Sequence, residues 1–331
     1  GRVADFSAQR IGTGQLSECY RVNLTYDGPT DEMPTSVIVK LPSQDAGSIE
    51  FARATGIYET ENRFYGEVAS STGVCVPRCY YTHVNADTTN FALILEDLRH
   101  SHQGDQFSGA TLDESTAVID QIARLHASTW HRPAVLDLGW LKDPYQFWGA
   151  AGANITSLYT AFAARYARRI QPEYLRIVER FASEFPRWLE TLKTPDCLWH
   201  SDLRLDNLML SDGSTADPVV VVDWQGLMRG PIAADVSYFI GNSLTAENRR
   251  RHEDSLVRRY FDALCAGGVE DLTWEQCQQG YRAQAFSSLV VSLISAIQVE
   301  QTERGDQMFA AMVQRAAEQI LDNDSFAALP R

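Results

Sequence analysis

Apolar residues follow two different periods along the chain, and the period changes near residue 98. Before that point, three runs alternate or are rich in β-branched residues, which is typical of strands: ECYRVNLTY, SVIVKLP and NFALILEDL. Between the second and third runs, residues 49–72 place apolar side chains at helical spacing, and this pattern ends before Gly73 and Pro77. We therefore expect a mostly β N-terminal region that contains a helix.

Longer amphipathic helices are expected in the rest of the chain. In residues 111–130, apolar side chains recur at i, i+4 and i+7, and the segment opens with Thr111 and Glu114 in a capping-box pattern. Thr273 and Gln276 form a second pattern of this kind. Further helices are expected around residues 156–170, 173–193, 246–266 and 274–300.

The change from a strand-like to a helical hydrophobic pattern near residue 98 predicts two lobes. Residues 1–98 are expected to form a small β-rich lobe, and residues 99–331 a larger helical lobe, in an α+β architecture. We find no internal repeat and no low-complexity linker in the sequence. With 331 residues, the chain is long enough for two such lobes with a proper core.

Composition narrows the classes of partner. The formal net charge of −14 argues against a nucleic-acid partner, which needs a basic face to neutralise phosphates. The most apolar run, residues 285–299, is short and contains Ser and Gln, so it indicates a buried helix and no membrane association. The six cysteines lack a C-x-x-C pair and the first ten residues lack an apolar signal-peptide core, which together favour a cytoplasmic protein with reduced thiols.

The candidate chemistry is concentrated in the stretch LWHSDLRLDNLML at residues 198–210. His200, Asp202 and Asn207 fit the pattern H-x-D-x-x-x-x-N, and a second β-run, DPVVVVDWQ, carries Asp223 at its end. Mg²⁺ prefers hard oxygen ligands and usually takes only one or two from the protein beside substrate phosphates. We therefore predict Asn207 and Asp223 as metal ligands and Asp202 as the group that holds an incoming hydroxyl. For Arg204, contact with the transferred phosphoryl group and simple solvation stay open.

A nucleotide site is predicted upstream of this stretch. Gly12, Thr13 and Gly14 lie between two strand-like runs, where the glycines allow backbone N–H groups to approach phosphates closely. Lys40 ends the run SVIVK, where its ammonium could neutralise phosphates. Glu61 on the following helix is the preferred partner for Lys40.

The partner of Lys40 and the position of the adenine base are less firmly indicated by the sequence. Glu59 and Glu67 lie on the same segment as Glu61 and are alternative partners for the lysine. The stretch LILEDL, with Glu96 and Leu98, offers backbone donors and acceptors for adenine where the two lobes join.

At this point the sequence resembles the protein-kinase-like superfamily. The phrases LHASTW, HSDLRLDN and VVDWQGLMRGPIAADVSYF are more closely similar to the aminoglycoside phosphotransferase and choline kinase group, with its ecdysteroid-kinase-like relatives. The likeness spans roughly residues 10–245. It implies a two-lobed kinase fold, with ATP and Mg²⁺ as cofactors.

The resemblance also implies roles for individual residues. Asp202 would be the catalytic aspartate, with Asn207 and Asp223 as the Mg²⁺ ligands. Lys40 and Glu61 would be the ion pair that positions the nucleotide. Asp235 would be a buried brace for the catalytic loop, and His200 would be structural.

Three departures from the protein-kinase pattern bear on the acceptor. The metal motif is Asp-Trp-Gln where Asp-Phe-Gly is usual, and Ser17 replaces the third loop glycine. Only about a dozen residues separate Asp223 from Asp235, which leaves no room for the long activation loop of a protein-phosphorylating kinase. We therefore expect transfer of the γ-phosphoryl group of ATP to a hydroxyl of a small molecule. The alternative is a catalytically silent pseudokinase that binds nucleotide or another small molecule.

The acceptor itself stays open between an aminoglycoside, a choline-like compound and a hydroxylated lipophile. The aromatic residues of segment 140–166 could form an acceptor wall or fill the helical core. A polycationic acceptor would require clustered carboxylates, which could equally be solvated helix ends. The candidates for such a cluster are Glu253, Asp254, Glu270, Asp271 and Glu275.

Overall fold

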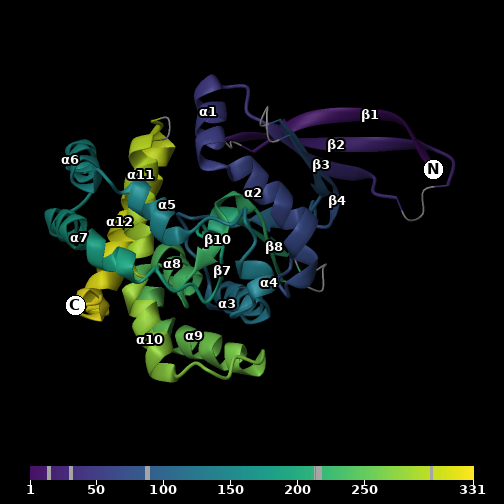
Figure 1. Ribbon diagram of the computed structural model, residues 1–331. Helices are drawn as coiled ribbons and strands as arrows, with labels where there is room; N and C mark the ends of the chain where they lie inside the picture. The colour runs from purple at the N-terminus through teal and green to yellow at the C-terminus, as the bar shows by residue number, and fades with distance from the viewer. Residues whose placement is uncertain (13–15, 30–32, 86–89, 212, 214–217, 299–300) are drawn as a thin grey trace.

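The computed structural model describes residues 1–12, 16–29, 33–85, 90–211, 213, 218–298 and 301–331. In Figure 1, a sheet that carries the N-terminus lies beside a larger, mainly helical body that carries the C-terminus. This arrangement confirms the two-lobed α+β architecture predicted from the change in hydrophobic period.

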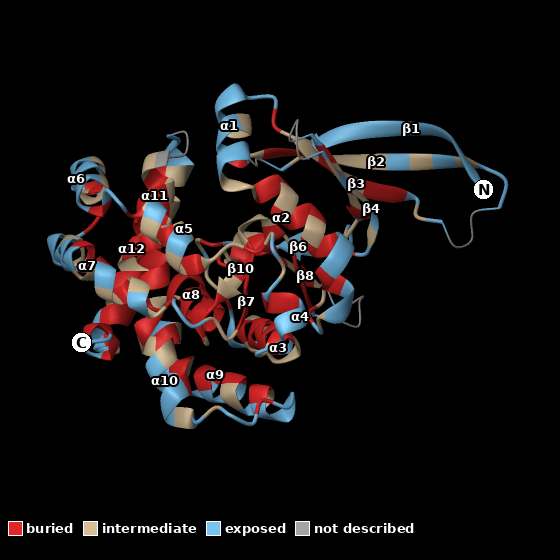
Figure 2. Cartoon of the chain, in the orientation of Figure 1, coloured by how far each residue is buried: buried red, intermediate tan, exposed pale blue. Residues whose placement is uncertain are grey.

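The small lobe is built on a five-stranded antiparallel sheet in the order β1-β2-β3-β5-β4. Its strands are β1 (Arg2–Ile11), β2 (Ser17–Asp27), β3 (Ser36–Pro42), β4 (Cys79–Val84) and β5 (Phe91–Glu96). The three predicted runs correspond to β2, β3 and β5. The edge strand β4 has no buried residue and β1 is exposed along almost its whole length (Figure 2), so neither shows the buried alternation that identifies a strand from sequence.

The helix predicted at residues 49–72 is broken at Gly56. The first part, α1 (Ala46–Thr55), ends there because Gly56 takes a left-handed φ of 68° and donates its N–H to Ala52 O. The chain continues as α2 (Ile57–Arg63), a π-helical turn η1 (Phe64–Val68) and a 3-10 turn η2 (Ala69–Ser71). The expectation of one continuous helix is therefore wrong, whereas its end before Gly73 is confirmed.

Helices make up most of the large lobe. They are α3 (Leu112–Thr129), α4 (Pro133–Leu136), α5 (Pro144–Ala151), α6 (Ile155–Tyr166), α7 (Pro172–Glu190), α8 (Ala234–Ser243), α9 (Ala246–Ala266), α10 (Trp274–Ala283), α11 (Phe286–Gln298) and α12 (Glu303–Asp322), with a last 3-10 turn η5 (Ser325–Ala328). Both predicted capping boxes are present, at the starts of α3 and α10. The helix expected at residues 274–300 is divided in two, because Gln284 leaves the helical conformation and donates its side-chain amide to Thr191, 2.8 Å away.

Two small sheets support the polar stretch around residue 200. In one, β7 (Cys197–Trp199) pairs with β10 (Met228–Gly230); in the other, β8 (Leu208–Ser211) lies between β6 (Ser101–Gln103) and β9 (Val219–Val221). The 3-10 turns η3 (Leu205–Asn207) and η4 (Trp224–Gly226) complete the segment. Because β7 and β9 are wholly buried, the polar residues that follow each of them are presented on a fixed base.

The aromatic segment is expected either to form an acceptor wall or to fill the helical core, and its buried rings fill the core. Trp148, Phe162 and Tyr166 are 6%, 0% and 0% exposed, in an apolar cluster shared with α7, α11 and α12. Tyr145, Phe147 and Tyr159 pack at the edge of the same cluster. Within the described residues there is no disulfide bond, and no helix has both the length and the apolar character to cross a bilayer.

One glycine allows α8 to pack closely against α12. A Cβ atom at Gly241 would lie 2.0 Å from Gln319 Oε1, and Gln319 is held in place because its Nε2 donates to Ser237 O at 3.1 Å and Tyr281 OH at 2.8 Å. We expect Gly241→Ala to lower the free energy of unfolding in urea by about 1–3 kcal/mol. Gly149→Ala is the matched control, because the nearest atom to its added Cβ would be Leu189 Cδ1 at 3.9 Å.

In this control the free energy of unfolding should stay the same or rise by about 0.5–1 kcal/mol, the usual gain for alanine over glycine in a helix. Equal unfolding free energies for the two variants would contradict the packing argument.

Candidate active site

A buried lysine lies between two carboxylates from distant parts of the chain. Lys40 Nζ of β3 is 2.7 Å from Glu61 Oε2 of α2 and 3.2 Å from Asp223 Oδ1, two residues after β9. The Lys40 side chain is only 9% exposed, and that of Asp223 is 40% exposed. Glu59 and Glu67 instead pair with Arg63, at 2.8 and 3.0 Å. Of the three candidate glutamates, Glu61 is therefore the one that faces and pairs with Lys40, and it is the one preferred from the sequence.

These charges set one another's ionisation. Burial works to lower the pKa of Lys40, but the charges of Asp223 and Glu61 outweigh it and raise that pKa. Burial works to raise the pKa of Asp223, but Lys40 holds it below its usual range. For Glu61, burial is the largest influence and raises the pKa against the opposing effect of Lys40. At neutral pH, Lys40 is therefore a cation and Asp223 a carboxylate.

The loop after β7 is centred on Asp202. The Asp202 Oδ2 atom accepts a hydrogen bond from Asn207 Nδ2 at 3.0 Å, and Oδ1 accepts from Tyr238 OH at 2.7 Å. Arg204 Nε lies 3.3 Å from Asp202 Oδ1, and the same guanidinium pairs with Asp206. Burial works to lower the pKa of Arg204, but Asp202 and Asp206 raise it. Arg204 is thus a fixed cation beside Asp202 and not a freely solvated one.

Asp235 holds the backbone of this loop, as the resemblance implied. It is completely buried at the start of α8, and its carboxylate accepts the backbone N–H groups of His200 at 2.9 Å and Ser201 at 3.2 Å. Ser201 has a left-handed φ of 69°, which is unfavourable for a residue with a Cβ. His126 Nε2 lies 3.2 Å from the same carboxylate. Two backbone donors and an imidazole therefore stabilise a strained turn directly before Asp202.

His200 has a structural role. Its Nδ1 accepts the backbone N–H of Asp202 at 3.3 Å, and its Nε2 lies 3.1 Å from Val222 O, to which it donates. Both ring nitrogens are thereby used to hold the backbone next to Asp202 and Asp223.

The Asp-Trp-Gln motif joins the small lobe to the loop. Trp224 stacks on Phe64 with ring centroids 3.9 Å apart, and its ring lies 4.7 Å from that of His200. Gln225 Nε2 is 3.4 Å from the hydroxyl of Ser17, the residue that replaces the third loop glycine. The tryptophan and glutamine therefore make contacts to the helix, the loop and β2 that fix the direction of Asp223.

Gly12 and the end of β5 lie on the same sheet as Lys40. Gly12 has a left-handed φ of 71° directly after β1, and Thr13 and Gly14 lie outside the described residues. On β5, Leu93 pairs with Lys40 and Glu96 pairs with Val37, so Glu96 is three residues, or about 10 Å, from the lysine along the strand. The carbonyl of Leu98 accepts Ser101 N–H at 2.9 Å in a turn.

The carboxylates considered for a polycationic acceptor do not gather at the loop. Glu253 is in a buried network with Arg249, and Asp271 bonds to Trp130 and His131. The remaining three are exposed, as expected for solvated helix ends: Asp254, Glu270 and Glu275.

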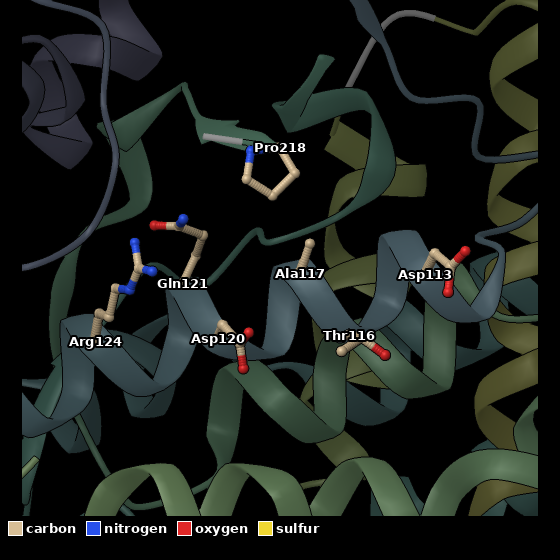
Figure 3. Close-up of a pocket in the computed structure, with 7 residues that line it drawn as sticks. All are labelled: Asp113, Thr116, Ala117, Asp120, Gln121, Arg124 and Pro218. Carbon is tan, nitrogen blue, oxygen red and sulfur yellow. The ribbon is translucent and has the colours of Figure 1, made fainter. Parts of the chain in front are cut away.

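A shallow depression on the outer face of α3 is unrelated to these residues (Figure 3). It has a volume of about 250 Å³, and polar groups in it already have partners: Gln121 accepts the N–H of Cys75 at 2.7 Å, and Asp120 pairs with Arg259 at 2.6 Å. Its lining consists of Asp113, Thr116, Ala117, Asp120, Gln121, Arg124 and Pro218.

Two residues of the site region are not apparent from sequence reasoning. Tyr238 reaches Asp202 from α8, whose residues are all buried, so no amphipathic period marks one of its faces. Asp97, between Glu96 and Leu98, has a side chain only 2% exposed that accepts hydrogen bonds from Ser36 at 2.6 Å and from Arg21 at 2.9 Å. A buried carboxylate needs such donors, and these tie the strand end to β2 and β3. Its position within LILEDL is the only signal the sequence offers.

The chain has a two-lobed, kinase-like fold. The sequence pattern of the phosphotransferase enzyme family matches residues 8–278, and the chain therefore belongs to this family.

Among solved structures, the chain is similar to choline kinase from Cryptosporidium parvum, with 11% identity, 97% of this chain and 91% of that chain covered, and a TM-score of 0.60. Ethanolamine kinase from Plasmodium vivax is also similar, with 10% identity, coverages of 96% and 82%, and a TM-score of 0.54. The aminoglycoside phosphotransferase APH(2″)-IIIa, in complex with GDP and kanamycin, gives 11% identity, coverages of 97% and 94%, and a TM-score of 0.56.

Two curated proteins of Caenorhabditis elegans are also similar in sequence. One is the uncharacterized oxidoreductase dhs-27, which is 20% identical. The match covers 85% of this chain and 38% of dhs-27. The other is the uncharacterized kinase-like protein D1044.1, which is 21% identical. The match covers 84% of this chain and 79% of D1044.1. The chain thus spans well under half the length of the first and most of the second.

The hydrogen bonds around Asp97 predict a pH-dependent stability. Burial opposes its ionisation, but the donors Ser36, Arg21 and Arg99 lower the pKa of Asp97 from its ordinary value of 3.8. A carboxyl with a lowered pKa contributes stability above its ordinary pKa and loses it as the pH falls through the folded value. At pH 7, Asp97→Asn should therefore reduce the free energy of unfolding by about 1–3 kcal/mol.

The difference between wild type and Asp97→Asn should narrow as urea unfolding is repeated at pH values below about 4, where the carboxyl of wild type takes up a proton first in the unfolded chain and at lower pH in the folded one. Asp254→Asn, at an exposed position, serves as the control and should change little. A difference that stays constant down to pH 3 would show that the charge of Asp97 is not involved.

Proposed function

We propose that the protein is a kinase that transfers the γ-phosphoryl group of ATP to a hydroxyl of a small molecule, with Mg²⁺ as cofactor. One observation carries the proposal: Lys40 is held between Glu61 and Asp223 while Asp202 and Asn207 are in contact within the neighbouring loop. Phosphoryl transfer depends mainly on positioning and on neutralisation of charge, and these groups are suited to both.

The residues present fit a magnesium ion. Asn207 uses its side-chain N–H₂ group on Asp202, which turns its Oδ1 away, and no described residue donates to that oxygen. Asp223 uses Oδ1 for Lys40, which leaves Oδ2 for another ligand. Two hard oxygen ligands match what Mg²⁺ commonly takes from a protein when substrate phosphates supply others. Bound magnesium would neutralise charge on the phosphate oxygens.

The nucleotide would lie along β3 and β5. The ammonium of Lys40 would neutralise phosphate charge, with Gly12, Thr13 and Gly14 providing backbone donors above it. The strand end at Glu96 and Leu98 would hold the base, since about 10 Å of strand separates Glu96 from Lys40. We assign nucleotide binding to residues 1–98, and catalysis and acceptor binding to residues 99–331.

In the transfer step, Asp202 would accept a hydrogen bond from the acceptor hydroxyl, orient it, and take its proton late. Arg204, fixed beside Asp202, would contribute positive charge near the transferred group. The similar structures include a choline kinase, an ethanolamine kinase and a phosphotransferase in complex with kanamycin, so a small alcohol, with or without an amine, is the proposed acceptor class. Because the five carboxylates considered for a polycationic acceptor do not gather at the loop, we favour a smaller alcohol over an aminoglycoside. A cytoplasmic location also belongs to this proposal.

Nucleotide binding can be tested without knowing the acceptor. A ligand that binds only the folded state stabilises it by about 2.7 kcal/mol at a hundredfold excess over Kd. We expect a non-hydrolysable ATP analogue with Mg²⁺ to raise the Tm of wild type, and the rise to be lost without Mg²⁺ or in Asp223→Ala. Glu67→Gln is the control and should keep the full rise, because Glu67 contacts Arg63 and not Lys40. If the Tm of wild type does not rise under any condition, nucleotide binding is overturned. The remaining alternative is then a catalytically silent pseudokinase that binds another small molecule.

Catalysis can be tested with Asp202→Asn. We expect this variant to keep the Mg²⁺-dependent rise in Tm while its turnover falls by a factor on the order of 10²–10⁴, the usual contribution of a positioned acid–base group. Turnover is measured as ATP consumption with water alone and with choline, ethanolamine, kanamycin and a hydroxylated steroid as acceptors. Wild-type turnover in Asp202→Asn would remove Asp202 from the mechanism.

A further inference from the structure

Helix α8 contributes two side chains to the catalytic loop from one of its faces. Asp235 and Tyr238 are three residues apart, which places them on the same side of the helix. Asp235 accepts backbone N–H groups before Asp202, and Tyr238 OH donates to Asp202 Oδ1 at 2.7 Å. Tyr238 is 0% exposed, and its ring belongs to the apolar cluster that contains Trp199. The hydroxyl is therefore held by a rigid helix and a packed ring.

We propose that Tyr238 is a positioning residue that fixes the Asp202 carboxylate, so that one oxygen lone pair is aimed at the acceptor hydroxyl. The inference rests on the proposed function, in which Asp202 orients that hydroxyl. It adds to this function a second role for α8, which holds both the backbone and the side chain of the catalytic aspartate.

The donors around Asp202 leave it little freedom. An ionised carboxylate offers about four lone-pair directions. Tyr238, Asn207 and Arg204 take three of them, the last at 3.3 Å. About one direction is left for an acceptor hydroxyl, so the set of donors decides where a productive hydroxyl can sit.

The phenol of Tyr238 can act only as a donor here. Burial is the largest influence and, with the nearby charge of Asp202, raises the pKa of Tyr238 well above its usual range. The hydroxyl thus stays protonated throughout the working pH range. Removing the hydroxyl would therefore take one fixed donor from the Asp202 carboxylate and leave it freer to rotate.

The matched experiment compares Tyr238→Phe with Tyr166→Phe. Both tyrosines are 0% exposed in the same apolar cluster, and each donates to a carboxylate: Tyr238 to Asp202, and Tyr166 to Asp306 at 2.8 Å. Each change removes one hydroxyl and keeps the ring. The pair therefore separates loss of a buried hydrogen bond in general from loss of the one that reaches Asp202.

We expect Tyr238→Phe to lower kcat on the order of 10-fold, the effect of one lost hydrogen bond. The KM for ATP and the rise in Tm with Mg²⁺ and the ATP analogue should stay at the wild-type values. Turnover is followed as Mg·ATP hydrolysis with water as acceptor and with any acceptor from the panel that is phosphorylated. Tyr166→Phe should keep the wild-type kcat.

A double-mutant cycle completes the test. In an Asp202→Asn background, Tyr238→Phe should cause almost no further loss, because the two side chains act as one unit. An unchanged kcat in Tyr238→Phe, or an equal loss in both backgrounds, would reduce Tyr238 to a packing role and overturn the inference while leaving the proposed function intact. If wild type neither consumes ATP nor gains stability from the analogue, the proposed function fails and the inference fails with it.

Discussion

The structure depends first on the need to compensate a buried ammonium. Lys40 cannot remain charged at 9% exposure unless carboxylates accompany it, and the two that do come from opposite lobes. Glu61 must therefore face β3, and Asp223 must reach back from β9. One turn after Glu61, Phe64 stacks on Trp224, so the same helix face that supplies the charge also packs against the residue following Asp223. Charge pairing and aromatic packing thus fix the same relation between the lobes.

A second constraint is the strain around the catalytic loop. Ser201 and Asp223 both have left-handed backbones, with φ of 69° and 63°. Such conformations persist where the surroundings over-determine them. At Ser201, the conformation is fixed by Asp235, which accepts the backbone N–H of Ser201. The Ser201 hydroxyl also donates to Gly226 O at 2.7 Å. A Cβ at Gly226 would lie 2.4 Å from that hydroxyl, so the close approach requires glycine.

How much the sequence could predict depends on how local each signal is. The strands β2, β3 and β5 and both capping boxes follow from short-range patterns, and the structure contains them. The sequence leaves Glu59, Glu61 and Glu67 open as partners of Lys40, with Glu61 preferred, and the structure pairs Lys40 with Glu61. The break at Gly56, the division at Gln284 and the fully buried helix α8 depend on tertiary contacts or lack an amphipathic period, so the periodicity could not indicate them. The contacts of Asp97 and Tyr238 join residues far apart in the chain, which one sequence does not reveal.

The same geometry bears on the size of the proposed acceptor. The segment between Asp223 and Asp235 makes no long excursion: β10 pairs with β7, and Ile232 N–H donates to Asp196 Oδ2 at 2.7 Å. On another side of the loop, Met308 Sδ of α12 lies 3.3 Å from Arg204. This end of α12 is anchored to α6, where Arg165 lies 2.5 Å from Asp306. A peptide needs an extended platform beside the catalytic aspartate, whereas these elements leave the approach to Asp202 bordered by a short, paired segment and a fixed helix. That setting favours a small alcohol over a protein substrate.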